Sequence, residues 1–102
     1  YKMKKQDVYI LIGKDHKYYK RKVQGQVIEV DNIKFVIIGD SKEGYNLTHY
    51  ETGMAVKYYC KLKELKADLE NIVFKFKQFP KSFLQNAIYH YETAEIESEV
   101  KE

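Results

Sequence analysis

The sequence has few of the residues from which disulfides, metal sites and phosphate loops are built. Its 102 residues include one cysteine, one proline, no tryptophan, and five glycines that occur one at a time. The lone Cys60 excludes an internal disulfide and a cysteine-rich zinc site, so nothing in the composition requires an oxidising compartment. The scattered glycines exclude a glycine-rich phosphate loop. We therefore expect no cofactor and no bound metal.

Long hydrophobic runs are also missing. No apolar stretch approaches the roughly 18 residues needed to cross a bilayer, and residues 1–5 lead into a polar stretch without the hydrophobic core of a signal peptide. A content of 44% hydrophobic and 32% charged residues is typical of a folded, soluble domain. A chain of this length builds one core. We expect a cytoplasmic protein that does not contact membranes.

Arginine is nearly absent, since Arg21 stands alone beside 17 lysines. Together with abundant isoleucine and tyrosine, this bias is typical of an AT-rich genome. It indicates a low-GC bacterium, or one of its phages or mobile elements.

The charges are divided unevenly along the chain. Residues 1–91 carry 17 basic against 10 acidic side chains, a balance of +7, whereas residues 92–102 carry one against five, a balance of −4. We expect residues 1–91 to form a single domain, and residues 92–102 to form an acidic C-terminal tail that frays or extends.

The first half of the chain has the pattern of strands. Val8 to Ile12 is a short apolar run closed by a glycine, which is typical of a buried strand. The stretch from Lys17 to Val30 is long for one strand, and we expect a bulge or a break at Gly25.

A tight hairpin follows at Asp31-Asn32, because both residue types tolerate the left-handed dihedrals of a two-residue turn. This turn length fixes the register of the two strands. The expected pairs are Val30 with Ile33, Glu29 with Lys34, Ile28 with Phe35, Val27 with Val36, and Gln26 with Ile37.

The next strand spans Tyr45 to Tyr50, and Glu51-Thr52-Gly53 closes a further hairpin with Gly53 in a left-handed conformation. The segment from Met54 to Tyr59 fits a last strand, because β-branched and aromatic residues favour extended structure. It also fits the start of a helix, because Met54 and Tyr58 continue the helical spacing of the leucines that follow.

The second half is helical. One apolar stripe predicts a helix over 61–78, and Ser82 with Gln85 three residues later predicts a capped second helix over 82–93. The stripe consists of Leu62, Leu65, Leu69, Ile72, Val73 and Phe76. The expected fold class is therefore α+β, with an antiparallel sheet of four or five strands over about 7–59 and two C-terminal helices packed on one face.

The residues that carry chemistry are sparse. His16, His49 and His90 lie far apart in sequence, and none of the pairs has the spacing of a metal motif. His49 with Glu51 is a formal acid-base pair, but a histidine near a carboxylate on a strand edge is usually plain surface. Cys60 has basic neighbours, as reactive cysteines do, although a small core-facing residue at the junction of sheet and helix is the commoner case.

Two segments interleave lysines with tyrosines: the first spans residues 17–22 and the second residues 57–63. A cation beside a stacking ring suits single-stranded nucleic acid, and alternate strand residues share a side. In a lysine-rich chain the same pattern is commonly the solvated face of a sheet, and a single arginine counts against specific recognition of bases. The candidate nucleic-acid contacts are Lys17, Tyr19, Arg21, Lys57, Tyr59 and Lys61.

Phe74 falls on the polar side of the first helix, away from the apolar stripe. Packing against the second helix explains such a residue most simply. A dimer or a host protein is the alternative, which makes Phe74 a candidate protein contact.

The stretch from Gly44 to Tyr50, followed by residues 51–56, contains the pattern Thr-His-x-x-Thr-Gly at residues 48–53. It resembles uncharacterised small proteins of phages and mobile elements of low-GC bacteria. The resemblance implies binding of a component of the host or of the element. The leading hypothesis is a non-enzymatic protein that acts through protein-protein interaction. Single-stranded nucleic-acid binding is the alternative, and a small enzyme that joins His49 to a distant carboxylate is the third.

Overall fold

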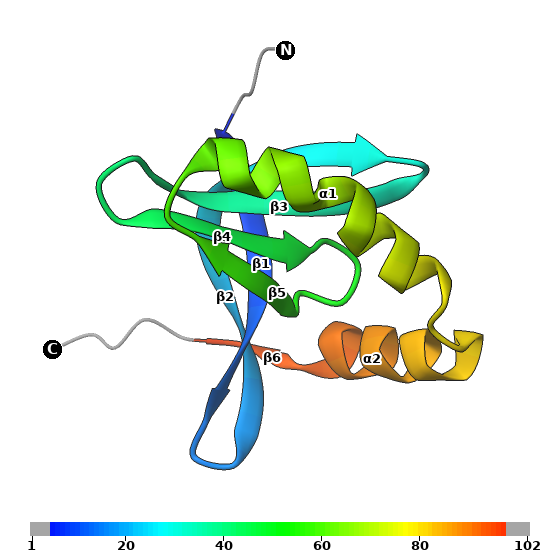
Figure 1. Cartoon of the computed structure of the whole chain (residues 1–102). Coiled ribbons are helices and arrows are strands. Elements are labelled where there is room, and N and C mark those ends of the chain that lie inside the picture. Colours follow the sequence, from blue (N-terminus) through cyan, green and yellow to red (C-terminus); the bar gives the residue numbers. More distant parts are fainter. Residues whose placement is uncertain (1–4, 98–102) are drawn as a thin grey trace, which may run out of the picture.

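The computed structural model describes residues 5–97, in which an antiparallel sheet is followed by two helices (Figure 1). The expected α+β class is confirmed. The order along the sheet is β1-β2-β3-β4-β5, and β6 is added to β2. The elements are β1 (Lys5–Lys14), β2 (Lys17–Val30), β3 (Ile33–Asp40), β4 (Gly44–His49), β5 (Ala55–Tyr59), α1 (Leu62–Lys77), α2 (Lys81–Thr93) and β6 (Glu95–Ile96).

Two-residue turns close the first two hairpins. Asp15-His16 joins β1 to β2, Asp31-Asn32 joins β2 to β3, and all four residues have positive φ, between 51° and 67°. These dihedrals match the right-handed twist of the flanking strands. The register predicted for the β2–β3 hairpin, from Val30 opposite Ile33 to Gln26 opposite Ile37, is confirmed pair by pair.

The expected bulge or break at Gly25 is not observed, because β2 runs through this residue without interruption. Here β2 leaves its pairing with β1 and begins to pair with β3. A Cβ atom on Gly25 would lie 2.5 Å from Cγ1 of Val36, so the glycine permits the close approach of β3. The register shift of the sheet lies instead between Leu47 and Thr48, where β4 meets β5.

The segment before α1 is a strand rather than the beginning of a helix. Residues 55–59 pair with β4, and α1 starts only at Leu62. Gly53 takes the predicted left-handed conformation, with φ of 66°. The turn at residues 50–53 therefore closes the sheet before the helical part begins.

The core lies between α1 and β2 to β5. Phe35 and Leu47 of the sheet and Leu65 of α1 are fully buried. The predicted stripe is confirmed, since its other members are either buried (Leu69, Ile72, Val73) or packed against the core (Leu62, Phe76).

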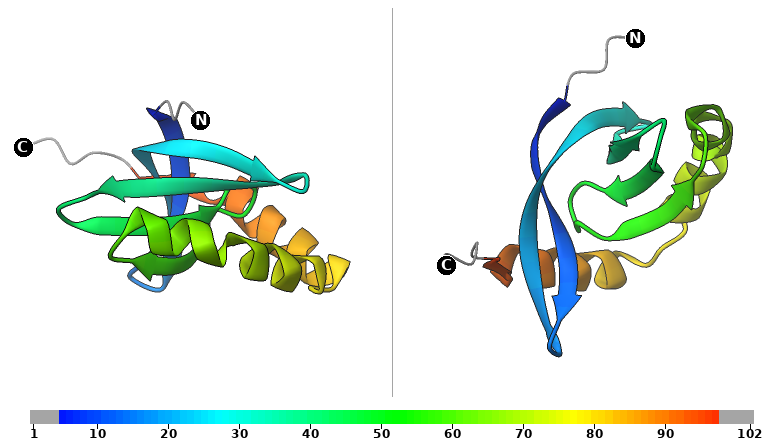
Figure 2. Two further views of the ribbon diagram at one scale, coloured as in Figure 1. Left: turned by 45° about the horizontal axis from the view of Figure 1, so that its top comes forward. Right: turned by 90° about the vertical axis from the view of Figure 1, so that its left-hand side faces the viewer.

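The sheet curls until β1 reaches the turn between β4 and β5. The backbone N–H of Leu11 in β1 donates to the carbonyl of Gly53, just before β5, over 2.8 Å. The right-hand view of Figure 2 shows this curl, with the β1–β2 hairpin on one side and β3 to β5 curving away from it. Within residues 5–97, β1 and β5 are not paired with each other, so the curled sheet is an incompletely closed barrel.

The helix α2 lies beside this contact between β1 and the turn before β5. The hydroxyl of Tyr91 donates to the carbonyl of Tyr9 over 2.9 Å, and the Tyr91 ring lies against Gly53. No residue of α2 is buried. The predicted Ser82 cap is wrong, because the helix already begins at Lys81, with Pro80 in extended conformation as N-cap residue. Proline fits there, because its φ is preset and it has no N–H to satisfy.

The segment expected as an acidic tail contributes to the sheet. Glu95 and Ile96 form β6, which pairs in parallel with Tyr19 and Lys20 of β2. Residues 98–102, also part of that expected tail, lie outside the described residues. No helix within residues 5–97 is long and apolar enough to cross a membrane.

Candidate functional site

The residues considered for catalysis do not form a site. His49 is buried, with its Nδ1 2.9 Å from Oγ1 of Thr52 and its ring stacked on Phe76 at a centroid distance of 4.6 Å. Burial lowers the pKa of His49, and the charge of Glu51 opposes part of this shift. His16 and His90 are exposed, and residues 5–97 contain no cluster of three or more potential metal ligands. His49 therefore serves packing in this fold.

Cys60 is exposed, so the interpretation as a core-facing residue is wrong. It follows Tyr59, which takes the buried position at the end of β5. The alternation of side chains along a strand directs the next residue away from the core.

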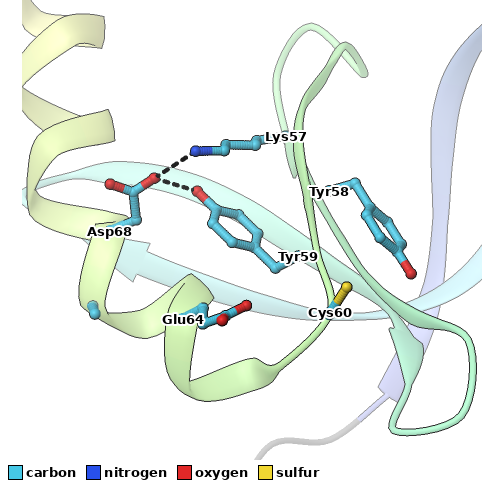
Figure 3. Close-up of a pocket in the computed structure, with 7 residues that line it drawn as sticks. Lys57, Tyr58, Tyr59, Cys60, Glu64 and Asp68 are labelled. Atoms are coloured by element: carbon cyan, nitrogen blue, oxygen red, sulfur yellow. Dashed lines mark hydrogen bonds and ion pairs between the residues drawn. The ribbon is translucent and has the colours of Figure 1, made fainter.

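The second lysine-tyrosine segment is a structural link between β5 and α1 (Figure 3). The hydroxyl of Tyr59 donates to Oδ2 of Asp68 over 2.6 Å, and Nζ of Lys57 lies 3.6 Å from the same oxygen. Burial raises the pKa of Tyr59, and the bond to Asp68 adds to this effect. The hydrogen bond from Tyr59 lowers the pKa of Asp68. With only 6% of Tyr59 exposed, its ring offers no stacking surface, and Lys61 remains as an exposed residue before α1.

The first lysine-tyrosine segment lies on β2, and its side chains meet carboxylates of the C-terminal segment. Lys17, Tyr19 and Arg21 project to one side of the strand. Arg21 is bound by Glu97 and Lys17 by Glu95. The strands β3 and β4 separate β2 from β5 in the sheet order, so the two segments do not lie on neighbouring strands.

Phe74 is 63% exposed on α1. Packing against α2, the explanation favoured by its spacing, therefore does not bury it.

An apolar groove runs between the start of β5 and α2. Two adjoining cavities, of about 230 and 460 Å³, share the lining residues Met54, Ala55, Phe83 and Ala87. We call these four residues and the other lining side chains the β5–α2 groove. The other lining residues are Leu11, Tyr18, Thr52, Val56, Phe76, Phe79, Leu84, Asn86 and His90.

The groove exposes large apolar side chains on both of its walls. Met54 on one wall is 41% exposed, and Phe79 and Phe83 on the other are 39% and 48% exposed. The rings of Phe76, Phe79 and Phe83 form a row with centroid distances of 5.1 and 5.3 Å. Neither cavity is lined by a carboxylate, lysine or arginine. Apolar side chains gathered in this way make the groove the candidate binding surface of the molecule.

No family model, curated protein or solved structure matches the chain. The geometry of the molecule must therefore carry the argument for function.

The strand next to the groove has an unused edge. Among residues 5–97, β5 pairs only with β4. Ala55 and Val56 at its start line the groove together with Met54, which precedes the strand. The sequence left residues 54–59 open between a strand and the start of a helix. It did not predict the groove, whose walls come from separate segments of the chain. The available signal was the series of apolar residues around that helix end, at positions 76, 79, 83 and 84.

Proposed function

We propose that the protein is a non-enzymatic binding protein that holds an extended, apolar segment of a partner protein in the β5–α2 groove. The single observation that supports this proposal is the exposure of Met54, Phe79 and Phe83 beside the free edge of β5. Association buries their apolar surface, which is the main favourable term in protein-protein binding.

The free edge of β5 favours an extended occupant over a helix. A partner strand added to a sheet edge gains main-chain hydrogen bonds, and its alternate side chains enter adjoining pockets. The two cavities of the groove are suited to receive such side chains. The balance of +7 over residues 1–91 favours a segment that also carries acidic residues.

The composition supports an origin in a phage or mobile element of a low-GC bacterium, with the host cytoplasm as the site of action. The bias of 17 lysines to one arginine is its basis. An interaction with a host protein fits that origin.

Selection from a displayed library of random peptides tests the proposal. Peptides selected on the wild-type protein are measured by calorimetry on F83E and on the matched control F74E. Phe74 is exposed on α1 and does not line the groove. We expect F83E to weaken binding by at least about tenfold, because a charge replaces a central apolar contact, and F74E to leave it unchanged.

A second variant, M54K, changes the opposite wall and is expected to have the same effect as F83E. The proposal would be refuted if the peptides bound F83E and M54K as tightly as the wild type. It would also be refuted if F74E weakened peptide binding as much as F83E does. Light scattering of the wild type at increasing concentration distinguishes a second copy of the chain as occupant, since only then does F83E reduce self-association.

A further inference from the structure

The β1–β2 hairpin carries a row of cations on one side. Lys14 lies opposite Lys17 across the hairpin, and Tyr19 and Arg21 follow at alternate positions of β2. We call these four residues the hairpin face. Its basic groups are all at least half exposed, and Nζ of Lys17 lies 5.8 Å from the centroid of the Tyr19 ring.

The strand β6 and the residue after it bring two carboxylates to the same side of the hairpin as these four residues. Glu95 pairs with Tyr19, and the N–H of Glu97 donates to the carbonyl of Lys20 over 2.7 Å. The carboxylate of Glu97 accepts two hydrogen bonds from Arg21, of 2.8 and 3.1 Å, and lies 3.9 Å from Nζ of Lys14. These contacts place acidic groups over the hairpin face.

The carboxylate of Glu95 makes the third ion pair, at 3.7 Å from Nζ of Lys17. Each basic residue of the hairpin face therefore contacts an anion of the same chain. Arg21 is the only arginine of the sequence, and it holds Glu97 in the two-pronged geometry with which a guanidinium also binds phosphate.

The attachment of β6 is slight. It pairs with β2 through two residues, and Ile96, its only apolar side chain, is 58% exposed. Exposed ion pairs contribute little to stability and are screened by salt. A ligand that offers a longer series of negative charges can therefore displace β6 from the hairpin face.

Without β6 the hairpin is strongly basic. Residues 5–25 carry six basic and two acidic side chains, a balance of +4, against the three carboxylates of Glu92, Glu95 and Glu97. The side of Tyr19 also carries the half-buried Ile10 and Ile12. Cations that alternate with a ring along a strand are suited to a single strand of nucleic acid, whose bases stack on the ring while its phosphates meet the cations.

We propose that the hairpin face binds single-stranded nucleic acid and that β6 covers it by holding Glu95 and Glu97 at the positions of phosphates. This site is independent of the β5–α2 groove, from which Lys14, Lys17, Tyr19 and Arg21 are absent. An experiment that refutes one of the two sites therefore leaves the other untouched.

Fluorescence anisotropy with a labelled oligothymidine of about 20 nucleotides, at about 50 and 200 mM salt, tests the proposal. The variant E95Q/E97Q removes the two covering charges. We expect it to bind about tenfold more tightly than the wild type. We also expect its affinity to fall more steeply with salt, because more cations are free to neutralise phosphates and so to release the counterions of the nucleic acid.

The control E29Q/E70Q makes the same change of net charge at two exposed residues that lie outside the hairpin face. We expect it to resemble the wild type. Adding R21Q or Y19A to E95Q/E97Q is expected to reverse the gain. In the wild type, the oligonucleotide is expected to speed hydrogen exchange at the amide of Glu97, since its bond to Lys20 must open.

Several results would overturn the proposal. One is the absence of binding by E95Q/E97Q at low salt, and another is an equal gain in E29Q/E70Q, which would trace the effect to net charge alone. Equal or tighter binding of a duplex of the same length would contradict a single-stranded ligand. Equal competition by a polyglutamate peptide would assign the hairpin face to acidic protein segments instead.

Discussion

The hydroxyl of Tyr59 and the carboxylate of Asp68 are joined by a hydrogen bond of 2.6 Å that ties the last strand of the main sheet to the first helix. Lys57 reaches the same carboxylate oxygen and lies over the Tyr59 ring, with Nζ 5.3 Å from the centroid. The three side chains thus link β5 to α1. Lys57 and Tyr59, which the sequence suggested as nucleic-acid contacts, form this link.

Replacement of Tyr59 by phenylalanine keeps the buried ring and removes only this bond. We expect Y59F to lower the free energy of unfolding by about 1–2 kcal/mol, because the bond to a charged acceptor is lost. Urea denaturation measures the change. The matched control is Y89F, whose ring is exposed. Equal stability of the two variants would contradict a structural role for the bond.

His49 makes stability depend on pH. Burial lowers its pKa in the folded protein, so the unfolded chain binds a proton first as the pH falls. The contribution of the neutral His49 ring to stability is therefore fully present above pH about 6.5, the pKa of histidine in the unfolded chain. It declines as the pH falls from that value to the lower pKa of His49 in the folded protein.

We expect the free energy of unfolding to be lower at pH about 5.5 than at pH about 7.5, and the difference to shrink in H49Q. Urea denaturation at both pH values is the measurement. The double variant H16Q/H90Q changes two exposed histidines and should keep the difference. A pH effect that follows H16Q/H90Q rather than H49Q would refute the assignment to His49.

The sequence predicts the parts of this fold that depend on neighbouring residues. The hairpin register follows from Asp31-Asn32, since both residues take the left-handed dihedrals that their short polar side chains tolerate. The apolar stripe of α1 likewise fixes which side of the helix meets the sheet.

The candidate sites depend on contacts between distant segments, which no local pattern encodes. Arg21 and Glu97 are 76 positions apart, and the groove forms only because the curl of the sheet brings Leu11 to Gly53 and leaves space beside α2. The sequence indicated a basic domain over residues 1–91 and an acidic segment over 92–102, but not that β6 would join β2. The local sequence around Phe83 is that of an ordinary core residue of a helix.

At Gly53 the turn before β5 is in close contact with both β1 and α2. Its φ is 66°, and an added Cβ would lie 2.6 Å from two ring carbons of Tyr91 and 2.9 Å from the backbone nitrogen of Leu11. We expect G53A to lower the free energy of unfolding by about 1–3 kcal/mol, because both strain and a clash are introduced. G13A is the control, since a Cβ there meets only a ring carbon of Tyr18 at 3.9 Å. If G53A and G13A proved equally stable in urea, Gly53 would not be the tight point of the fold.

The two helices should differ in local stability. Four residues of α1 are buried and none of α2, which is held by partly buried side chains and by the bond from Tyr91 to the carbonyl of Tyr9. Segments with few buried contacts open without global unfolding. We expect the amides in the middle of α2 to exchange with solvent at least about tenfold faster than those of α1.

Hydrogen exchange followed by NMR resolves the two helices residue by residue. Y91F removes the bond to Tyr9 and should speed exchange in α2 while leaving α1 unchanged, because α1 is anchored by its own buried residues. Y89F, on the exposed side of the same helix, is the control and should change neither. Equal protection of α1 and α2 in the wild type would show that α2 unfolds only with the whole domain. The wall of the β5–α2 groove would then be as rigid as the core, and a partner would have to enter it without movement of α2.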